Sequence, residues 1–146
     1  MATRLESRSA ELSRLIEAAD GDHQCRIAVR VAEAALAAVR IDEPELASAV
    51  VDLAAGRRGG PGLRSAKALT ERLDELAWDI QERVDEGRAE QAEYLEAFRR
   101  ARAVNAVVFA LGAEDTQEAA LEAAYEAEAA TEDLALIRGI VDEVLG

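Results

Sequence analysis

The clearest pattern of hydrophobic and polar positions lies between residues 69 and 84, where apolar side chains recur every three or four residues. They are Leu69, Leu73, Leu76, Ala77, Ile80 and Val84. This spacing places them on one side of a helix, so it predicts an amphipathic helix whose apolar side faces the core. Gly87 follows the pattern and marks the end of the helix.

Two earlier segments also have the pattern of helices. Residues 25–39 are apolar nearly all round after Arg30, which is typical of a central helix. Pro44 fits the first turn of a third helix, and Gly56 ends it. The residues of this third helix that we expect to face inward are Leu46, Val50 and Leu53.

Capping signals supply the remaining boundaries. Thr3 and Glu6 have the spacing of a capping box and predict a first helix, which ends at the sequence DGD of residues 20–22. A fifth helix is expected over about 89–111, ended by Gly112.

Near the C-terminus, Asp115 and Glu118 form a second capping box that starts a sixth helix, and Thr131 is expected to cap a short seventh. The sequence therefore predicts one all-α domain over residues 1–146, with six to seven helices in a compact bundle or a short α-hairpin array. The glycine-rich stretch 56–62 is expected to be a loop between helices.

Composition supports this fold class and restricts the function. Aromatic residues are only 3% of the chain, and the abundance of alanine, leucine, glutamate and arginine favours helices. The net charge of −13 argues against a general nucleic-acid binder and favours basic partners. Cys25 is the only cysteine, and the start of the chain has no long apolar run, so we expect a cytoplasmic protein without a signal peptide.

Residues suited to catalysis or metal binding do not occur in recognisable motifs. His23 is the only histidine, which makes a structural zinc site or a di-iron site improbable, although a carboxylate-only magnesium or calcium site stays open. The stretch RRGGPGLR follows a helix and not a strand, so a loop is favoured over a phosphate cradle. We expect no cofactor, no metal and no catalytic residues.

Basic and polar residues interrupt the apolar pattern of the fifth helix. At 100° per residue, one side carries Tyr94, Phe98, Arg102, Asn105 and Phe109. The C-terminal half of this helix is apolar around its circumference, so Arg102 and Asn105 are expected at or beside the core. A buried guanidinium requires a carboxylate or carbonyl partner. For Arg102 and Asn105, a structural ion-pair network is the favoured interpretation, and a ligand pocket is the alternative. Arg99 and Arg100 are expected outside, near Glu96.

Trp78 lies on the side of its helix opposite the apolar pattern. The carboxylates around it are those of Glu71, Asp74, Glu75, Glu82 and Asp85. An apolar anchor inside a charged collar is typical of a protein-contact hot spot, and the negative charge would steer a basic partner. The alternative is that Trp78 packs under a neighbouring helix or loop.

Residues 114–146 form a second acidic region, with ten acidic residues and one basic residue. This region is either a solvated surface or another contact with a basic protein.

The arrangement of the helices also carries a resemblance. The sequence AFRRARAVNAVVFAL followed by DTQEAALEAAYEAEAAT, after an alanine-rich helix and the helix with Trp78, resembles small all-helical actinobacterial proteins of the immunity type from polymorphic toxin systems. The similar region covers roughly residues 26–145. The resemblance implies a cytoplasmic protein that binds and blocks a toxin without catalysis of its own.

Three functions remain in view at the level of sequence. The first is a non-enzymatic acidic module that binds a basic protein. One version of this module is an immunity protein that binds and occludes a basic toxin. The second is a homodimer or assembly subunit that associates through an apolar helix face. The third is a small-ligand binder or enzyme with a pocket at Arg102 and Asn105.

Overall fold

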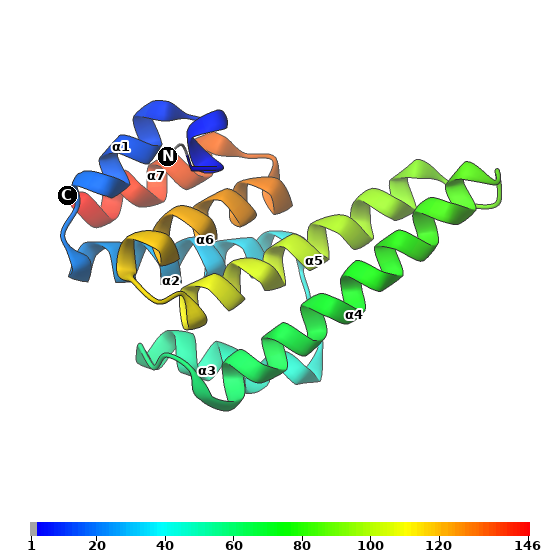
Figure 1. Cartoon of the computed structure of the whole chain (residues 1–146), viewed down its shortest axis with the longest axis horizontal. Coiled ribbons are helices and arrows are strands. Elements are labelled where there is room, and N and C mark those ends of the chain that lie inside the picture. Colours follow the sequence, from blue (N-terminus) through cyan, green and yellow to red (C-terminus); the bar gives the residue numbers. More distant parts are fainter. Residues whose placement is uncertain (1–2) are drawn as a thin grey trace.

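The computed structural model describes residues 3–146, and that part of the chain contains seven α-helices and two short 3-10 helices but no strand (Figure 1). The all-α prediction is confirmed. The α-helices are α1 (Ala10–Ala18), α2 (Gly21–Val39), α3 (Ala47–Ala55), α4 (Gly60–Asp85), α5 (Gln91–Gly112), α6 (Thr116–Thr131) and α7 (Leu134–Leu145), and the 3-10 helices are η1 (Leu5–Ser7) and η2 (Pro44–Leu46).

Helix α2 is central, as its apolar circumference predicts. It packs against α5 and α6 and, less extensively, against α3 and α7. In Figure 1, α1 and α7 lie on one side of α2 and α6, and α3 lies on the other side. The large side chains of the core include Ile27 and Val31 of α2 and Leu111 of α5, each nearly or fully inaccessible to solvent. These helices form the body of the molecule.

Helices α4 and α5 form an antiparallel hairpin whose far end projects beyond the body (Figure 1). We call residues 74–99 the arm. Its hydrophobic cluster is separate from that of the body and consists of Ala77, Ile80 and Ala97, with Val84, Ala89 and Tyr94 packed against them. Toward its tip, each helix of the arm has little cover besides the other helix, so large parts of both stay exposed (Figure 1).

The prediction of where the first helix begins is wrong. The Thr3 hydroxyl does accept the N–H of Glu6 at 3.3 Å, but only η1 follows. Ser9 has an extended backbone, and its Oγ accepts the N–H of Leu12 at 3.1 Å, so a new helix begins at Ala10. Asp20 does not simply end a helix: its carboxylate caps α2, which therefore includes the rest of the DGD sequence.

Three other local predictions also need correction. Val50 and Leu76 are each 45% exposed, not in the core. Thr131 ends α6, and Asp133 caps α7 by accepting the N–H of Leu136 at 3.0 Å. The predicted loop 56–62 is shorter, because α4 begins at Gly60.

Two glycines explain the geometry of that short loop. Gly56 ends α3 with a φ of 70°, a left-handed conformation that glycine adopts without strain. Gly62 lies in the first turn of α4, where an added Cβ would approach the Cα of Ala49 to 3.0 Å and meet the Asp52 carboxylate. The absence of a side chain at position 62 therefore allows α3 and α4 to cross closely.

Candidate protein-contact face

Trp78 is exposed on the arm. The buried residues of α4 include Leu73, Ala77 and Ile80, and the indole points away from them, with 68% of the residue accessible to solvent. Its Nε1–H donates to Oε1 of Glu82, one turn further along, at 3.1 Å. The alternative in which Trp78 packs under a neighbouring element is thus not the arrangement in this structure.

The carboxylates near Trp78 differ in their partners. Asp74 accepts a hydrogen bond from Arg102 of α5 at 2.7 Å, so its charge is already compensated within the chain. Glu82 bonds the indole, and Asp85 accepts from the Gln81 amide at 2.9 Å. Glu71 and Glu75 are exposed, and among residues 3–146 neither has an ion-pair partner. These last two carboxylates are available to an incoming cation.

Arg102 is paired, and the structure identifies its partners. Nη1 donates to Glu126 of α6 at 2.9 Å and Nη2 to Asp74 of α4 at 2.7 Å, while Nε has no hydrogen-bond partner within the described residues. The side chain is 17% exposed. Asn105 is half-buried, and neither it nor Arg102 lines any of five hollows on residues 3–146. The geometry favours the structural ion-pair interpretation over a ligand pocket.

Arg99 lies near Glu96, as predicted, but its ion-pair partner is a different carboxylate. It pairs with Glu132, the residue that follows α6, at 3.0 Å, and its side chain is 38% exposed. Arg99 and Arg100 also line a polar hollow with Glu96, between α5 and the C-terminal ends of α2 and α6. Because helix C-termini carry partial negative charge, both guanidinium groups are well placed to stabilise those ends.

Sequence reasoning missed Arg4, which joins the same network from the other end of the chain. Its guanidinium bonds Glu122 and also Glu126, the latter at 2.8 Å. It also lies over the rings of Tyr125, at 4.3 Å from the centroid, and Phe109, at 5.8 Å. Nothing in the local sequence around Arg4 indicates these contacts, since they join positions more than a hundred residues apart.

The two glutamates also affect the protonation of Arg4. Desolvation by burial alone would lower the pKa of the Arg4 guanidinium, but the hydrogen bonds and charges of Glu122 and Glu126 outweigh it and raise the pKa above its ordinary value. Arg4 therefore stays protonated at ordinary pH values. Glu126 is fully buried and lies between this cation and Arg102.

Aromatic side chains lie along the same network. The Tyr94 and Phe98 rings stack with centroids 5.9 Å apart, and the Arg102 guanidinium lies 5.6 Å from the centroid of Phe98. Trp78 is one turn beyond Asp74 on α4, and Phe98 is one turn before Arg102 on α5. Because the two helices are antiparallel, the Asp74–Arg102 pair places Trp78 and Phe98 toward the tip on the same side of the arm.

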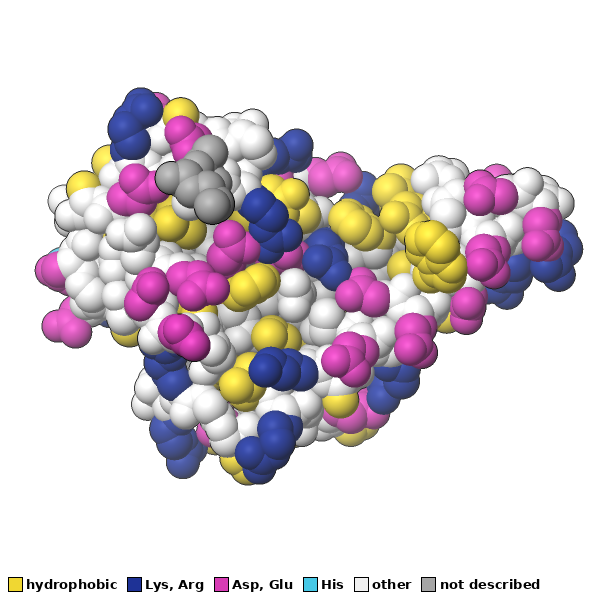
Figure 2. Space-filling model, viewed as in Figure 1, with side chains coloured by type: hydrophobic (Ala, Val, Ile, Leu, Met, Phe, Trp, Pro, Cys, Tyr) yellow, Lys and Arg dark blue, Asp and Glu magenta, His cyan; other side chains and the backbone are white. Residues whose placement is uncertain are grey.

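We call this surface the aromatic face. It consists of Trp78, Tyr94, Phe98, Phe109 and Tyr125 together with Arg4 and Arg102. On the side of the molecule shown in Figure 2, hydrophobic, basic and acidic side chains lie next to one another over the junction of the body with α5 and along the arm. Aromatic and arginine side chains are the types enriched at protein interfaces. The arrangement is suited to contact with another protein.

Residues 3–146 contain neither a candidate metal site nor a candidate membrane-spanning helix. No group of three or more histidine, cysteine, aspartate or glutamate side chains in that range is arranged to hold a metal ion. None of the described helices has both the length and the apolar character that crossing a membrane requires.

Comparisons with models of known protein families, with curated proteins and with solved structures found no match to this chain. The geometry of the aromatic face and the arm is therefore the basis for inferring a function.

Proposed function

We propose that this chain is a non-enzymatic, acidic protein-binding module whose arm and aromatic face contact a basic protein. The observation that carries the proposal is the exposure of Trp78, at 68%, next to the uncompensated carboxylates of Glu71 and Glu75. Leaving an indole in water costs free energy that burial in an interface recovers. Tryptophan is also the residue type most often found to anchor such interfaces.

The charge of the arm supports a basic partner. Residues 74–99 include nine acidic and three basic residues, a net charge of −6 within a chain of net charge −13. A projecting element with this charge attracts cationic surfaces and raises the rate of encounter. Glu71, Glu75, Glu82 and Asp85 would surround the anchor, whereas Asp74 would act indirectly, by holding α4 against α5 through Arg102.

In its narrower form, the proposal is that the partner is a toxin whose active site the protein occludes. The resemblance of the helix arrangement to immunity proteins supports this form. It predicts that the partner inhibits growth when expressed alone and is harmless when expressed together with this protein. A partner that is not toxic would remove the narrower form and leave the protein-binding function in place.

The test compares four versions of the protein as baits for partners in a lysate of the native host: wild type, Trp78→Ala, the double variant Glu71→Lys/Glu75→Lys, and the control Asp42→Lys/Glu114→Lys. The control makes the same change in net charge at exposed positions of the body. We expect a basic protein to be retained by the wild type and the control, but not by Trp78→Ala or by Glu71→Lys/Glu75→Lys, which we call the two arm variants.

Affinity is then measured with the purified partner. Trp78→Ala should weaken binding by about 2 kcal/mol or more, roughly 30-fold. The Glu71→Lys/Glu75→Lys variant should also flatten the dependence of affinity on salt, because fewer charges are screened. Equal binding by the arm variants and the control would show that the contact surface lies elsewhere.

A homodimer is the second candidate, and one observation favours it. Val50 and Val51 are adjacent on α3 and are 45% and 55% exposed, so the outer side of α3 presents an apolar surface. Light scattering over a range of concentrations tests this candidate: a mass that doubles, and that returns to the monomer value in Val50→Glu/Val51→Glu, supports it. A monomer at all concentrations contradicts it.

A further inference from the structure

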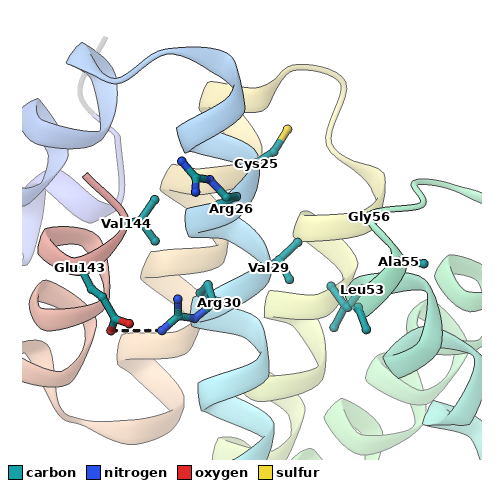
Figure 3. A pocket seen from close by; sticks show the side chains of 10 residues that line it. Cys25, Arg26, Val29, Arg30, Leu53, Ala55, Gly56, Glu143 and Val144 are labelled. Carbon is teal, nitrogen blue, oxygen red and sulfur yellow. Dashed lines mark hydrogen bonds and ion pairs between the residues drawn. The ribbon is translucent and has the colours of Figure 1, made fainter. Parts of the chain in front are cut away.

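A trough crosses the outer side of α2 on a part of the molecule that shares no residue with the aromatic face. Its volume is about 420 Å³, within the range of roughly 300–1,000 Å³ for ligand pockets. Helix α2 forms its floor, and α3 and α7 form its two walls (Figure 3). We call it the α2 trough; the residues that line its floor are Cys25, Arg26, Val29 and Arg30.

The wall residues and the inner end of the trough are largely apolar. Leu53 of α3 lies beside Val29, and Val144 of α7 lies on the opposite wall, beyond Arg26 and Arg30 (Figure 3). A second hollow of about 50 Å³ shares Cys25, Val29 and Leu53 with the trough and reaches the buried side chain of Leu111. The trough therefore continues as a narrow apolar slot toward the core.

Arginines line both the outer trough and the inner hollow. Arg26 and Arg30 are one turn apart on α2, and Arg57 and Arg58 line the inner hollow from the loop after α3. Two acidic residues, Asp52 and Glu143, line the hollows as well. The lining thus carries four positive and two negative charges, although the whole chain is strongly acidic.

These arginines are weakly engaged within the chain. Among residues 3–146, neither Arg26 nor Arg58 has a carboxylate within ion-pair distance. Arg30 meets Glu143 at 3.2 Å with both side chains well exposed, and Arg57 meets Asp52 at 3.4 Å. The exposed Arg30–Glu143 pair contributes little to stability, so Arg30 can exchange its partner readily. Uncompensated guanidinium groups beside an apolar slot are suited to an anion with an apolar tail.

We propose that the α2 trough binds a small amphipathic carboxylate, that is, a linear monocarboxylate with a medium-length alkyl chain. The carboxylate pairs with Arg26, assisted by Arg30, and the alkyl chain lies along Val29 and Leu53 toward the inner slot. A compact anion without a tail, such as phosphate, leaves the apolar lining in contact with water and gains only the surface ion pair. Binding at this site is independent of the protein partner of the arm.

Cys25 is a built-in reporter for this site. It is the only cysteine of the chain, it lines both hollows, and it is half-buried. The experiment measures the rate at which iodoacetamide, a neutral reagent, alkylates Cys25, by mass spectrometry of the intact protein. Decanoate is the probe, used below its micellar concentration; acetate, inorganic phosphate and decylammonium are the comparison compounds.

We expect decanoate to slow alkylation in a saturable way and the three comparison compounds to leave the rate unchanged. Arg26→Gln should weaken decanoate binding by about 10-fold, since it removes a charged hydrogen-bond donor. Glu143→Gln should strengthen binding, because it removes the carboxylate that competes for Arg30. Arg14→Gln, an exposed arginine of α1, is the matched control and should behave as the wild type.

Filling the trough gives an independent check that does not depend on charge. Ala55 lines the wall formed by α3 and is exposed, so Ala55→Trp can occupy the trough with little disturbance of the core. This variant should lose decanoate binding by calorimetry while its thermal unfolding stays close to that of the wild type. Equal protection by decylammonium and decanoate, unchanged affinity in Arg26→Gln, or absence of any decanoate binding would overturn the proposal.

Discussion

The carboxylate of Glu126 is the centre of the network that joins the body to the base of the arm, so its replacement is the most informative test of the structure. It is fully buried, and its two oxygens accept from Arg4 at 2.8 Å and from Arg102 at 2.9 Å. Glu126→Gln keeps the shape of the side chain. It removes the negative charge and turns an NH2 group toward one of the two guanidinium groups, where both sides are donors.

The expected cost follows from these contacts. A hydrogen bond to a charged group contributes about 1.5–3 kcal/mol; one of the two is lost and the other becomes weaker. Arg4 retains Glu122 and Arg102 retains Asp74, so neither guanidinium is left without a carboxylate. We therefore expect Glu126→Gln to lower the free energy of unfolding by about 2–4 kcal/mol.

Glu128→Gln is the matched control. Glu128 also lies on α6, is also buried, and accepts two hydrogen bonds from one arginine, Arg8, at 2.8 and 2.9 Å. Because half of the Arg8 side chain is exposed, water can solvate this cation when the charge of Glu128 is removed. We expect this variant to cost about 1–2 kcal/mol, less than Glu126→Gln, which weakens contacts to two arginines.

The assay is urea unfolding followed by circular dichroism, with a double-mutant cycle that combines Glu126→Gln and Arg102→Met. The two changes should be coupled by about 1–2 kcal/mol, since the residues are in direct contact. A cost for Glu126→Gln no larger than that of the control, or changes that add without coupling, would refute the account of Glu126 as the centre of the network.

Three other predictions concern single residues. Trp78 is the only tryptophan, so the quenching of its fluorescence by each ion can be expressed relative to the quenching of free N-acetyltryptophanamide by the same ion. On this relative scale caesium should quench Trp78 more strongly than iodide, and the difference should vanish in high salt, because the surrounding carboxylates repel the anion; stronger relative quenching by iodide contradicts the negative collar. Asp133→Ala should lower stability in urea by about 1 kcal/mol, and Thr131→Ala by less, because Asp133 caps α7; the reverse order contradicts the assigned cap. The backbone N–H of His23, and to a smaller extent its ring, donate hydrogen bonds to the Asp20 carboxylate and hold the pKa of Asp20 below its ordinary value. Asp20 therefore stabilises the fold at pH values above its unfolded-state pKa of about 4, and this stabilisation is lost as the pH falls below that value. The difference in stability between wild type and Asp20→Ala, measured by urea unfolding at a series of pH values, should therefore shrink on acidification; a difference that grows contradicts the assignment.

Local sequence was sufficient to predict the helices but not the neighbours of each helix. The spacing of residues 69–84 defines one side of α4, and most of that side is buried. Leu76 is the exception because it lies on a flank of the arm, where α5 is the only neighbour and leaves the flank uncovered. Val50 is exposed for a related reason: the buried side of α3 is centred on Ala49 and Leu53. Helical periodicity gives the direction of a side chain, whereas tertiary packing decides which directions are covered.

The same distinction applies to the candidate site. Burial of Arg102 could be inferred from the apolar half of α5, and electrostatics then required a partner. The identity of the partners could not be inferred, because Glu126 and Asp74 are 24 and 28 residues away and meet Arg102 only through the packing of α4, α5 and α6. Competing caps explain the local errors: Ser9 and Asp133 have the same chemistry as the residues first chosen, and only the backbone conformation decides between them.

The contact between Arg4 and Glu126 has a consequence for the order in which the protein is made. The two residues are separated by 122 positions, so Arg4 is synthesised long before Glu126. Helices α4 and α5 can pair as soon as both have emerged, so the arm is available early. The base of the aromatic face is different, since Arg4 has no buried carboxylate to bind until α6 has been synthesised. A nascent chain therefore presents Trp78 before it presents the finished surface, and it offers a partner both only after α6 has been synthesised.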